Sequence, residues 1–123
     1  MKTINSLEEL NIPFNYKSFI LHFLSNISKV ENVSKVVLFG SCARGDLQVK
    51  SDIDILVIVD DEISIDEELY IMSECPPNGD DEYYVPADII VDPIRNYNRF
   101  KETFGMLQKA VEREGVDLSE LLR

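Results

Sequence analysis

The sequence has no tryptophan, one histidine and two cysteines. Because His22 stands alone, catalytic mechanisms and metal sites that need two imidazoles are excluded. Cys42 and Cys75 are too few and too far apart to indicate a disulfide framework or a zinc site, so we expect free thiols. Apolar runs such as residues 55–59 are far shorter than the roughly 20 residues of a transmembrane helix, which excludes that class of membrane protein.

Positive charge is also scarce, since 12 Lys and Arg residues stand against 23 Asp and Glu residues, for a formal net charge of −11. Such a surface repels phosphate backbones, so we expect no direct nucleic-acid binding. A small anionic substrate remains compatible, because a few local cations and a metal ion can bind a triphosphate on an acidic protein. The first residues lack the apolar block of a secretory signal, and we expect a soluble, cytoplasmic protein with no membrane contact.

The 123 residues, of which 45% are hydrophobic, fit one domain over residues 1–123, with a core over about residues 34–115. Apolar spacing predicts an N-terminal amphipathic helix over about residues 15–31, with Asn15 as a candidate N-cap. Three short apolar runs predict buried strands at residues 36–39, 55–59 and 87–91, the last beginning after Pro86.

Two further helices are expected after the second strand. Residues 65–72 form one, with Ile65, Leu69 and Met72 on its apolar face and a capping box between Ser64 and Glu67. The other has Phe100, Phe104, Leu107 and Val111 on one face and ends near Gly115. This order of elements indicates an α/β or α+β fold in which helices cover a small sheet.

The first motif lies where the 36–39 strand ends, at Gly40-Ser41-Cys42-Ala43-Arg44-Gly45. A small-residue turn between a strand and a short helix lets backbone N–H groups and the Ser41 hydroxyl approach phosphate oxygens. By itself a Gly-Ser pair more often marks only a tight turn. The motif matches neither the P-loop nor the dinucleotide-binding pattern.

The second motif is Asp52-Ile53-Asp54 at the beginning of the 55–59 strand. Residues i and i+2 of a strand point to the same face, roughly 6.5 to 7 Å apart at Cα. Two carboxylates at this separation can share a hard cation, or hold two cations that clamp a phosphoryl group. The alternative, two solvated residues at a strand end, leaves like charges at the mouth of a buried strand unexplained.

A third acid, Asp88, interrupts the apolar 87–91 strand, where a carboxylate without a role or a partner is unfavourable. If this strand lies beside the one that carries Asp54, Asp88 completes a three-carboxylate site that binds metal and accepts a proton from a hydroxyl. The competing residue is Asp92, which precedes Pro93 and is more simply explained as a turn residue.

Taken together, Gly40-Ser41, Asp52-Ile53-Asp54 and the later Asp88 resemble the signature of the DNA polymerase beta-like nucleotidyltransferase superfamily. The short chain is most similar to its minimal nucleotidyltransferase (MNT) group. The resemblance implies a small mixed β-sheet with helices packed on it. It also implies magnesium-dependent transfer of a nucleoside monophosphate, AMP from ATP being favoured, to an acceptor hydroxyl.

By this resemblance, Gly40 and Ser41 hold the β- and γ-phosphates, and Asp52, Asp54 and Asp88 hold Mg²⁺. Arg44 contacts phosphate or forms a surface ion pair. Small members of the group are often antitoxins encoded beside a HEPN-domain toxin, and some transfer AMP to a toxin tyrosine. The expected partners are therefore ATP and a HEPN toxin.

Three other interpretations stay open. A non-catalytic antitoxin could retain the fold and only bind its partner. A nucleotidyltransferase that modifies an aminoglycoside-like small molecule is a second alternative, although 123 residues leave little room for a substrate domain. A polymerase or poly(A)-adding role is disfavoured by the acidic charge. The long acidic stretch from Ser73 to Pro86 departs from a standard short member and is either a connection or a partner-facing loop.

Overall fold

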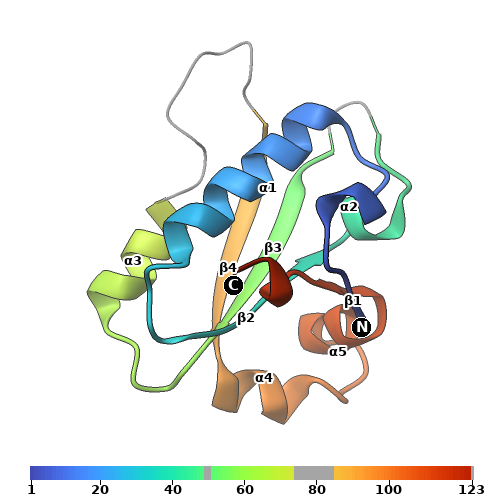
Figure 1. Ribbon diagram of the computed structural model, residues 1–123. Coiled ribbons are helices and arrows are strands. Elements are labelled where there is room, and N and C mark those ends of the chain that lie inside the picture. The colour runs from blue at the N-terminus through green and yellow to red at the C-terminus, as the bar shows by residue number, and fades with distance from the viewer. Residues whose placement is uncertain (49–50, 74–84, 123) are drawn as a thin grey trace.

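The computed structural model describes residues 1–48, 51–73 and 85–122 (Figure 1). These residues form a five-stranded mixed sheet with the strand order β1-β5-β2-β3-β4. The strands are β1 (Lys2–Thr3), β2 (Val33–Phe39), β3 (Ile53–Val59), β4 (Ala87–Pro93) and β5 (Val116–Asp117). The predicted mixed sheet and its three apolar strands are confirmed. The two-residue strands β1 and β5 are too short to show an alternating pattern, so the sequence does not predict them.

Strand β3 lies between β2, to which it is antiparallel, and β4, to which it is parallel. In this register Phe39 pairs with Asp54, and Asp54 pairs with Asp88 on the other side. The next residues along, Ile55 and Ile89, also pair. Because side chains alternate along a strand, the two carboxylates lie on one face of the sheet and the two isoleucines on the other.

The isoleucine face packs against α1 (Phe14–Ile27), which crosses the sheet in Figure 1. The spacing of its apolar residues is confirmed, because the side chains that it buries are Tyr16, Phe19, Ile20, Phe23, Leu24 and Ile27. Its bounds differ from those expected. Pro13 is the N-cap in place of Asn15, since a proline with its fixed φ is well suited to the start of a helix. The helix ends at Ile27, not near residue 31.

The carboxylate face packs against α4 (Ile94–Phe100) and α5 (Leu107–Glu114). Its apolar cluster is the smaller of the two, and consists of Val37, Leu56, Ile58, Tyr97 and Val111. The expectation of one helix through Phe100, Phe104 and Val111 is wrong. Gly105 has a φ of +83°, a left-handed conformation that ends a helical path, and it separates α4 from α5. The predicted end near Gly115 is confirmed, because Gly115 is the C-cap of α5.

Helix α3 (Ile65–Ser73) begins with the predicted capping box. The Glu67 N–H donates to Ser64 Oγ over 3.1 Å, and the Ser64 N–H donates to Glu67 Oε1 over 3.2 Å. The expected apolar face is wrong, since Ile65, Leu69 and Met72 are exposed and Ile71 is the buried residue. Of the Ser73–Pro86 connection, residues 74–84 lie outside the described residues.

Three short helical elements complete the described fold: η1 (Leu7–Glu9), α2 (Ser41–Arg44) and η3 (Ser119–Leu122). Helix α2 is a single turn between β2 and β3 and contacts both strands. Among the described residues, no helix combines the length and apolar character needed to cross a membrane.

Candidate active site

The turn after β2 brings Gly40 against the carboxylate of Asp54. Gly40 has φ +73° and ψ −154° and is the N-cap of α2. A Cβ added at this position would lie 2.4 Å from Asp54 Oδ2, which is closer than real Cβ contacts come. Only glycine therefore satisfies both the backbone conformation and the close approach. The sequence predicts a glycine that admits phosphate, and the structure adds that it makes room for a carboxylate.

Asp54 and Asp88 are direct neighbours across the parallel strands β3 and β4. Neighbouring strands lie about 4.8 Å apart, so their side chains leave the sheet side by side on one face. The expectation that the strand of Asp88 lies beside that of Asp54 is thus confirmed. Burial raises the pKa of Asp54, and the negative charges of Asp88 and Asp52 raise it further, while Arg44 acts in the opposite direction.

Asp52 lies just before β3 and is exposed, whereas Asp54 is half-buried. The backbone around Asp52 is held by two side chains from other elements. The Tyr16 hydroxyl of α1 donates to the Ser51 carbonyl over 2.7 Å. The Cys42 thiol of α2 donates to the Asp52 carbonyl over 3.6 Å. These contacts hold the backbone in place just before β3. The negative charge of Asp52 contributes to the raised pKa of Asp54.

Arg44, in the last turn of α2, takes part in two ion pairs. Its Nε lies 3.2 Å from Asp46 Oδ2, and its Nη1 lies 3.5 Å from Glu114 Oε2 at the end of α5. The surface ion pair considered for Arg44 is therefore present. Its contact with phosphate stays a prediction. Glu114 had no distinguishing signal in the sequence, since one glutamate among many charged residues points to no partner.

Ser41 opens α2, where its carbonyl accepts the N–H of Gly45 over 2.9 Å. Together with Gly40, it lies on the segment that approaches Asp54. The five residues Gly40, Ser41, Arg44, Asp54 and Asp88 thus come from α2 and the facing ends of β2, β3 and β4. Nucleotide binding by Gly40, Ser41 and Arg44 stays a prediction.

The metal-binding role of the three carboxylates also stays a prediction. In the described ranges, no three His, Cys, Asp or Glu side chains are drawn together closely enough to hold a metal ion. The chemistry of the donors nevertheless fits Mg²⁺, because carboxylate oxygens are the hard ligands that this ion prefers. Burial, and then repulsion by Asp88 and Asp52, raises the pKa of Asp54, and a bound dication would relieve the repulsion.

The turn interpretation of Asp92 is wrong. Asp92 lies within β4 and is buried. It is four residues along the strand from Asp88, and therefore about 13 Å from it. Its Oδ1 accepts the side-chain amide of Asn96 over 2.7 Å, and its Oδ2 accepts that of Gln108 over 3.1 Å. Asp92 ties β4 to α4 and α5 and is not part of the candidate site, in agreement with the preference for Asp88.

Comparison with known proteins shows which family shares this sequence. The family model described as "Polymerase beta, Nucleotidyltransferase" matches residues 23–85, more than half of the chain. A protein of Methanocaldococcus jannaschii, named as a candidate protein adenylyltransferase, is 31% identical over 87 residues, which cover 69% of this chain and 83% of that protein. A crystal structure of a candidate nucleotidyltransferase from Sulfolobus solfataricus is 26% identical, covers 75% of this chain and 85% of that chain, and has a TM-score of 0.43.

The family match contains Gly40, Ser41, Arg44, Asp52 and Asp54 and ends before Asp88. The assignment rests on this match and on the archaeal relative. The resemblance inferred from the two motifs is thereby confirmed. The chain belongs to the polymerase beta-type nucleotidyltransferase family, as a member of its minimal (MNT) group.

Proposed function

We propose that this nucleotidyltransferase transfers AMP from ATP to a hydroxyl group on a protein, with Mg²⁺ as its cofactor. The observation that carries the proposal is the pairing of Asp54 with Asp88 across β3 and β4, beside Gly40. The name of the archaeal relative, a protein adenylyltransferase, supports a protein as acceptor. We further propose that the acceptor is a tyrosine of a HEPN-domain toxin and that the chain acts as its antitoxin.

In this proposal Asp52, Asp54 and Asp88 hold Mg²⁺, which supplies positive charge that neutralises the triphosphate. The backbone N–H groups of Gly40 and Ser41 bind phosphate oxygens, and their fixed position needs no reorganisation during the reaction. Arg44 adds a further cation at the phosphates. Binding by these groups orients the α-phosphorus toward the acceptor, and this positioning supplies much of the rate enhancement.

The chemical step is an in-line displacement at the α-phosphorus. A carboxylate oxygen of Asp88 accepts the proton of the acceptor hydroxyl. The acceptor oxygen then forms a bond to the α-phosphorus, while the bond from this phosphorus to the bridging oxygen of pyrophosphate breaks. AMP is left on the acceptor, and pyrophosphate departs.

Incubation with ATP labelled at the α-phosphate and the co-purified acceptor protein tests the proposal. The wild-type chain should label the acceptor, and the chelator EDTA should abolish the labelling. Asp54→Asn and Asp88→Asn should each reduce the rate on the order of 10²–10³-fold, as the loss of one charge-stabilising group does in other enzymes. The matched control is Asp66→Asn, which changes an exposed carboxylate of α3.

The alternatives give different results in the labelling assay or in an assay of toxin neutralisation. Toxin neutralisation that persists without ATP and in the double Asp52→Asn/Asp54→Asn variant indicates a non-catalytic antitoxin. Labelling of an aminoglycoside, with no labelling of protein, indicates a small-molecule acceptor. Labelling that is insensitive to both Asp54→Asn and Asp88→Asn would falsify the site assignment itself.

A further inference from the structure

The α4–α5 segment differs in charge from the rest of the chain. Residues 94–114 contain five Lys or Arg residues and three Glu residues, whereas the whole chain has a net charge of −11. Lys101 and Lys109 form no ion pair with any carboxylate in the described ranges. Arg113 pairs with Glu114, and its side chain is still 68% exposed. The segment is therefore a local basic surface on an acidic protein.

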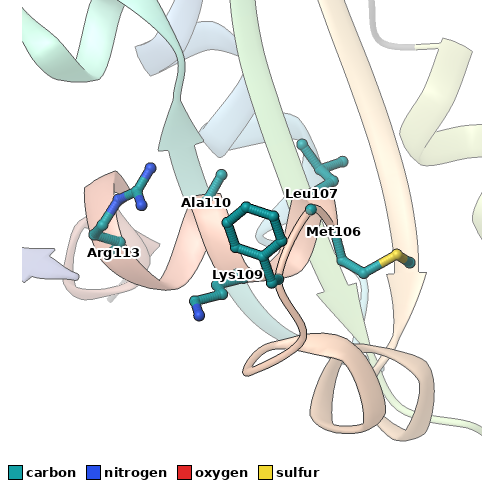
Figure 2. A pocket seen from close by; sticks show the side chains of 7 residues that line it. Met106, Leu107, Lys109, Ala110 and Arg113 are labelled. Atoms are coloured by element: carbon teal, nitrogen blue, oxygen red, sulfur yellow. The ribbon is translucent and has the colours of Figure 1, made fainter.

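A pocket of about 320 Å³ lies on this surface, lined by Phe104, Met106, Leu107, Lys109, Ala110 and Arg113 among others. Figure 2 shows Leu107, Ala110 and Arg113 on one side of α5 and Lys109 directed away from them. Phe104 is 91% exposed, and the Lys109 ammonium lies 6.0 Å from the centre of its ring. The pocket thus combines apolar walls with cations at its rim. We call Phe104, Leu107, Lys109, Ala110 and Arg113 the α5 patch.

We propose that the α5 patch is a docking site for a short acidic segment of the acceptor protein, with one apolar side chain of that segment in the pocket. The proposal rests on the proposed function, in which the acceptor is a protein. An exposed aromatic ring beside Met and Arg is typical of the centre of protein interfaces. Glutamates or aspartates flanking the apolar side chain would pair with Lys109 and Arg113, and would be repelled by the rest of this acidic surface.

The α5 patch continues into the candidate active site through charged side chains. Arg113 Nη2 lies 3.1 Å from Glu114 Oε1, and the other oxygen of Glu114 lies 3.5 Å from Arg44. Arg44 in turn affects the pKa of Asp54. A series of charged side chains thus links the α5 patch to the surroundings of Asp54.

An acidic peptide fits this surface better than a nucleic acid does. Nucleic-acid affinity comes mainly from neutralising several phosphates along the strand. Here the adjoining hollow of about 290 Å³ places Glu102 and Glu112 among Lys101, Lys109 and Arg113. A strand that continues from the patch into this hollow meets the negative charges of Glu102 and Glu112. A short peptide needs only the patch itself.

The binding test uses the full chain and a fluorescein-labelled peptide of glutamates around one leucine, followed by fluorescence anisotropy. Reversing the charge in the double variant Lys109→Glu/Arg113→Glu should weaken binding on the order of tenfold or more. The control Lys29→Glu/Lys35→Glu makes the same change of net charge at two exposed lysines elsewhere and should bind as the wild type does. Phe104→Ser should weaken binding, while Leu69→Ser, at another exposed apolar residue, should not.

Three results would overturn the docking site. An equal loss of peptide affinity in both charge-reversed variants would mean that the peptide responds only to the net charge of the protein and not to the α5 patch. Tighter binding of a labelled oligouridylate than of the peptide, lost in Lys109→Glu/Arg113→Glu, would assign the patch to RNA. Self-association in sedimentation velocity, lost in Phe104→Ser, would assign it to a second copy of the chain.

The AMP-transfer assay separates this proposal from the proposed function. If both are right, Lys109→Glu/Arg113→Glu raises the KM for the acceptor protein and leaves kcat unchanged. Wild-type transfer with an unchanged KM in this variant overturns the docking site and leaves the proposed function intact. If the wild type transfers no AMP to protein, the proposed function fails, and the peptide measurements still decide whether the patch binds acidic segments.

Discussion

The carboxylate of Asp54 occupies the space that a side chain at Gly40 would need, because an added Cβ would lie 2.4 Å from Asp54 Oδ2. The backbone of Gly40, with φ +73° and ψ −154°, also lies in a region that is essentially restricted to glycine. We expect Gly40→Ala to lower the free energy of unfolding by roughly 1–3 kcal/mol. It should also reduce AMP transfer, since Asp54 is displaced. Urea denaturation and the labelling assay measure the two effects.

Gly45→Ala is the control for Gly40→Ala. Gly45 also has a positive φ of +79°, yet no atom lies within 4 Å of the position of an added Cβ. This variant should lose about 1–2 kcal/mol from the left-handed backbone alone and retain its transfer rate. Full activity in Gly40→Ala would show that the position of Asp54 does not depend on this contact.

Asp88 and Asp92 lie on the same face of β4, but their replacement by alanine should have different effects on stability and on AMP transfer. Asp92→Ala leaves the amides of Gln108 and Asn96 without their acceptor, which should cost about 1–3 kcal/mol of unfolding free energy. Asp88→Ala removes an exposed carboxylate that repels Asp54, so stability should be kept while transfer is lost. Thermal or urea denaturation of both variants, alongside the transfer assay, gives the comparison. Loss of stability in Asp88→Ala alone would reverse the two assignments.

Cys42 should be inert toward alkylation in the folded protein. Burial raises the pKa of its thiol to about 11, and the charges of Asp54 and Asp52 add to this effect. In a Cys75→Ser background, iodoacetamide should label Cys42 slowly near neutral pH and rapidly in urea, because the thiolate is the reactive form. A native rate equal to the rate in urea would contradict its burial.

The raised pKa of Cys42 also makes the stability of the folded protein depend on pH in the alkaline range. The raised pKa in the folded state means that the unfolded thiol, with an ordinary pKa of 9.0, ionises first. The stability contributed by the protonated thiol is therefore full below 9.0 and is lost as the pH rises toward 11. Cys42→Ala should show a flatter decline in this range when melting temperatures are compared across pH.

The lowered pKa of Glu67 makes the stability of the folded protein depend on pH in the acidic range. Its pKa lies below the ordinary value, chiefly because the Ser64 N–H donates to the carboxylate, and then because the Asn32 amide does so. A lowered folded pKa contributes stability above the ordinary value of 4.5, and this stability is lost as the pH falls through the folded pKa. When melting temperatures are compared across acidic pH, Glu67→Gln should show a smaller fall than the wild type. Glu62→Gln, at an exposed residue, should show the same fall as the wild type.

The features that the sequence predicts well are local ones. The Gly40 turn, the Asp54 strand and the Ser64 capping box each depend on a few consecutive residues whose conformational preferences agree with the final structure. The position of Asp88 beside Asp54 could also be predicted from the sequence, because a lone carboxylate in an apolar strand is unfavourable unless it has a partner or a role. The family motifs and the core of the sheet follow from the same short-range patterns.

The features that the sequence does not predict depend on tertiary packing. The apolar spacing from Phe100 to Val111 is compatible with one helix, and only the left-handed Gly105 divides it. On α3 the spacing favours the face of Leu69, yet the helix buries Ile71. The contact of Arg44 with Glu114 joins residues 70 positions apart, and nothing in either segment indicates the partner. Likewise, the amides that hold Asp92 become visible only once α4 and α5 are placed.

The pairing register of β4 links the integrity of the core to the chemistry of the enzyme. Strand β4 places Ile89 in the larger core through the same alternation that places Asp88 beside Asp54. A slip of one residue would exchange the two faces, moving Asp88 into the apolar layer under α1 and Ile89 to the face that now carries the carboxylates. In the proposed function, a molecule that holds Asp88 beside Asp54 is thus also a correctly paired one, and we expect mispaired chains to transfer no AMP.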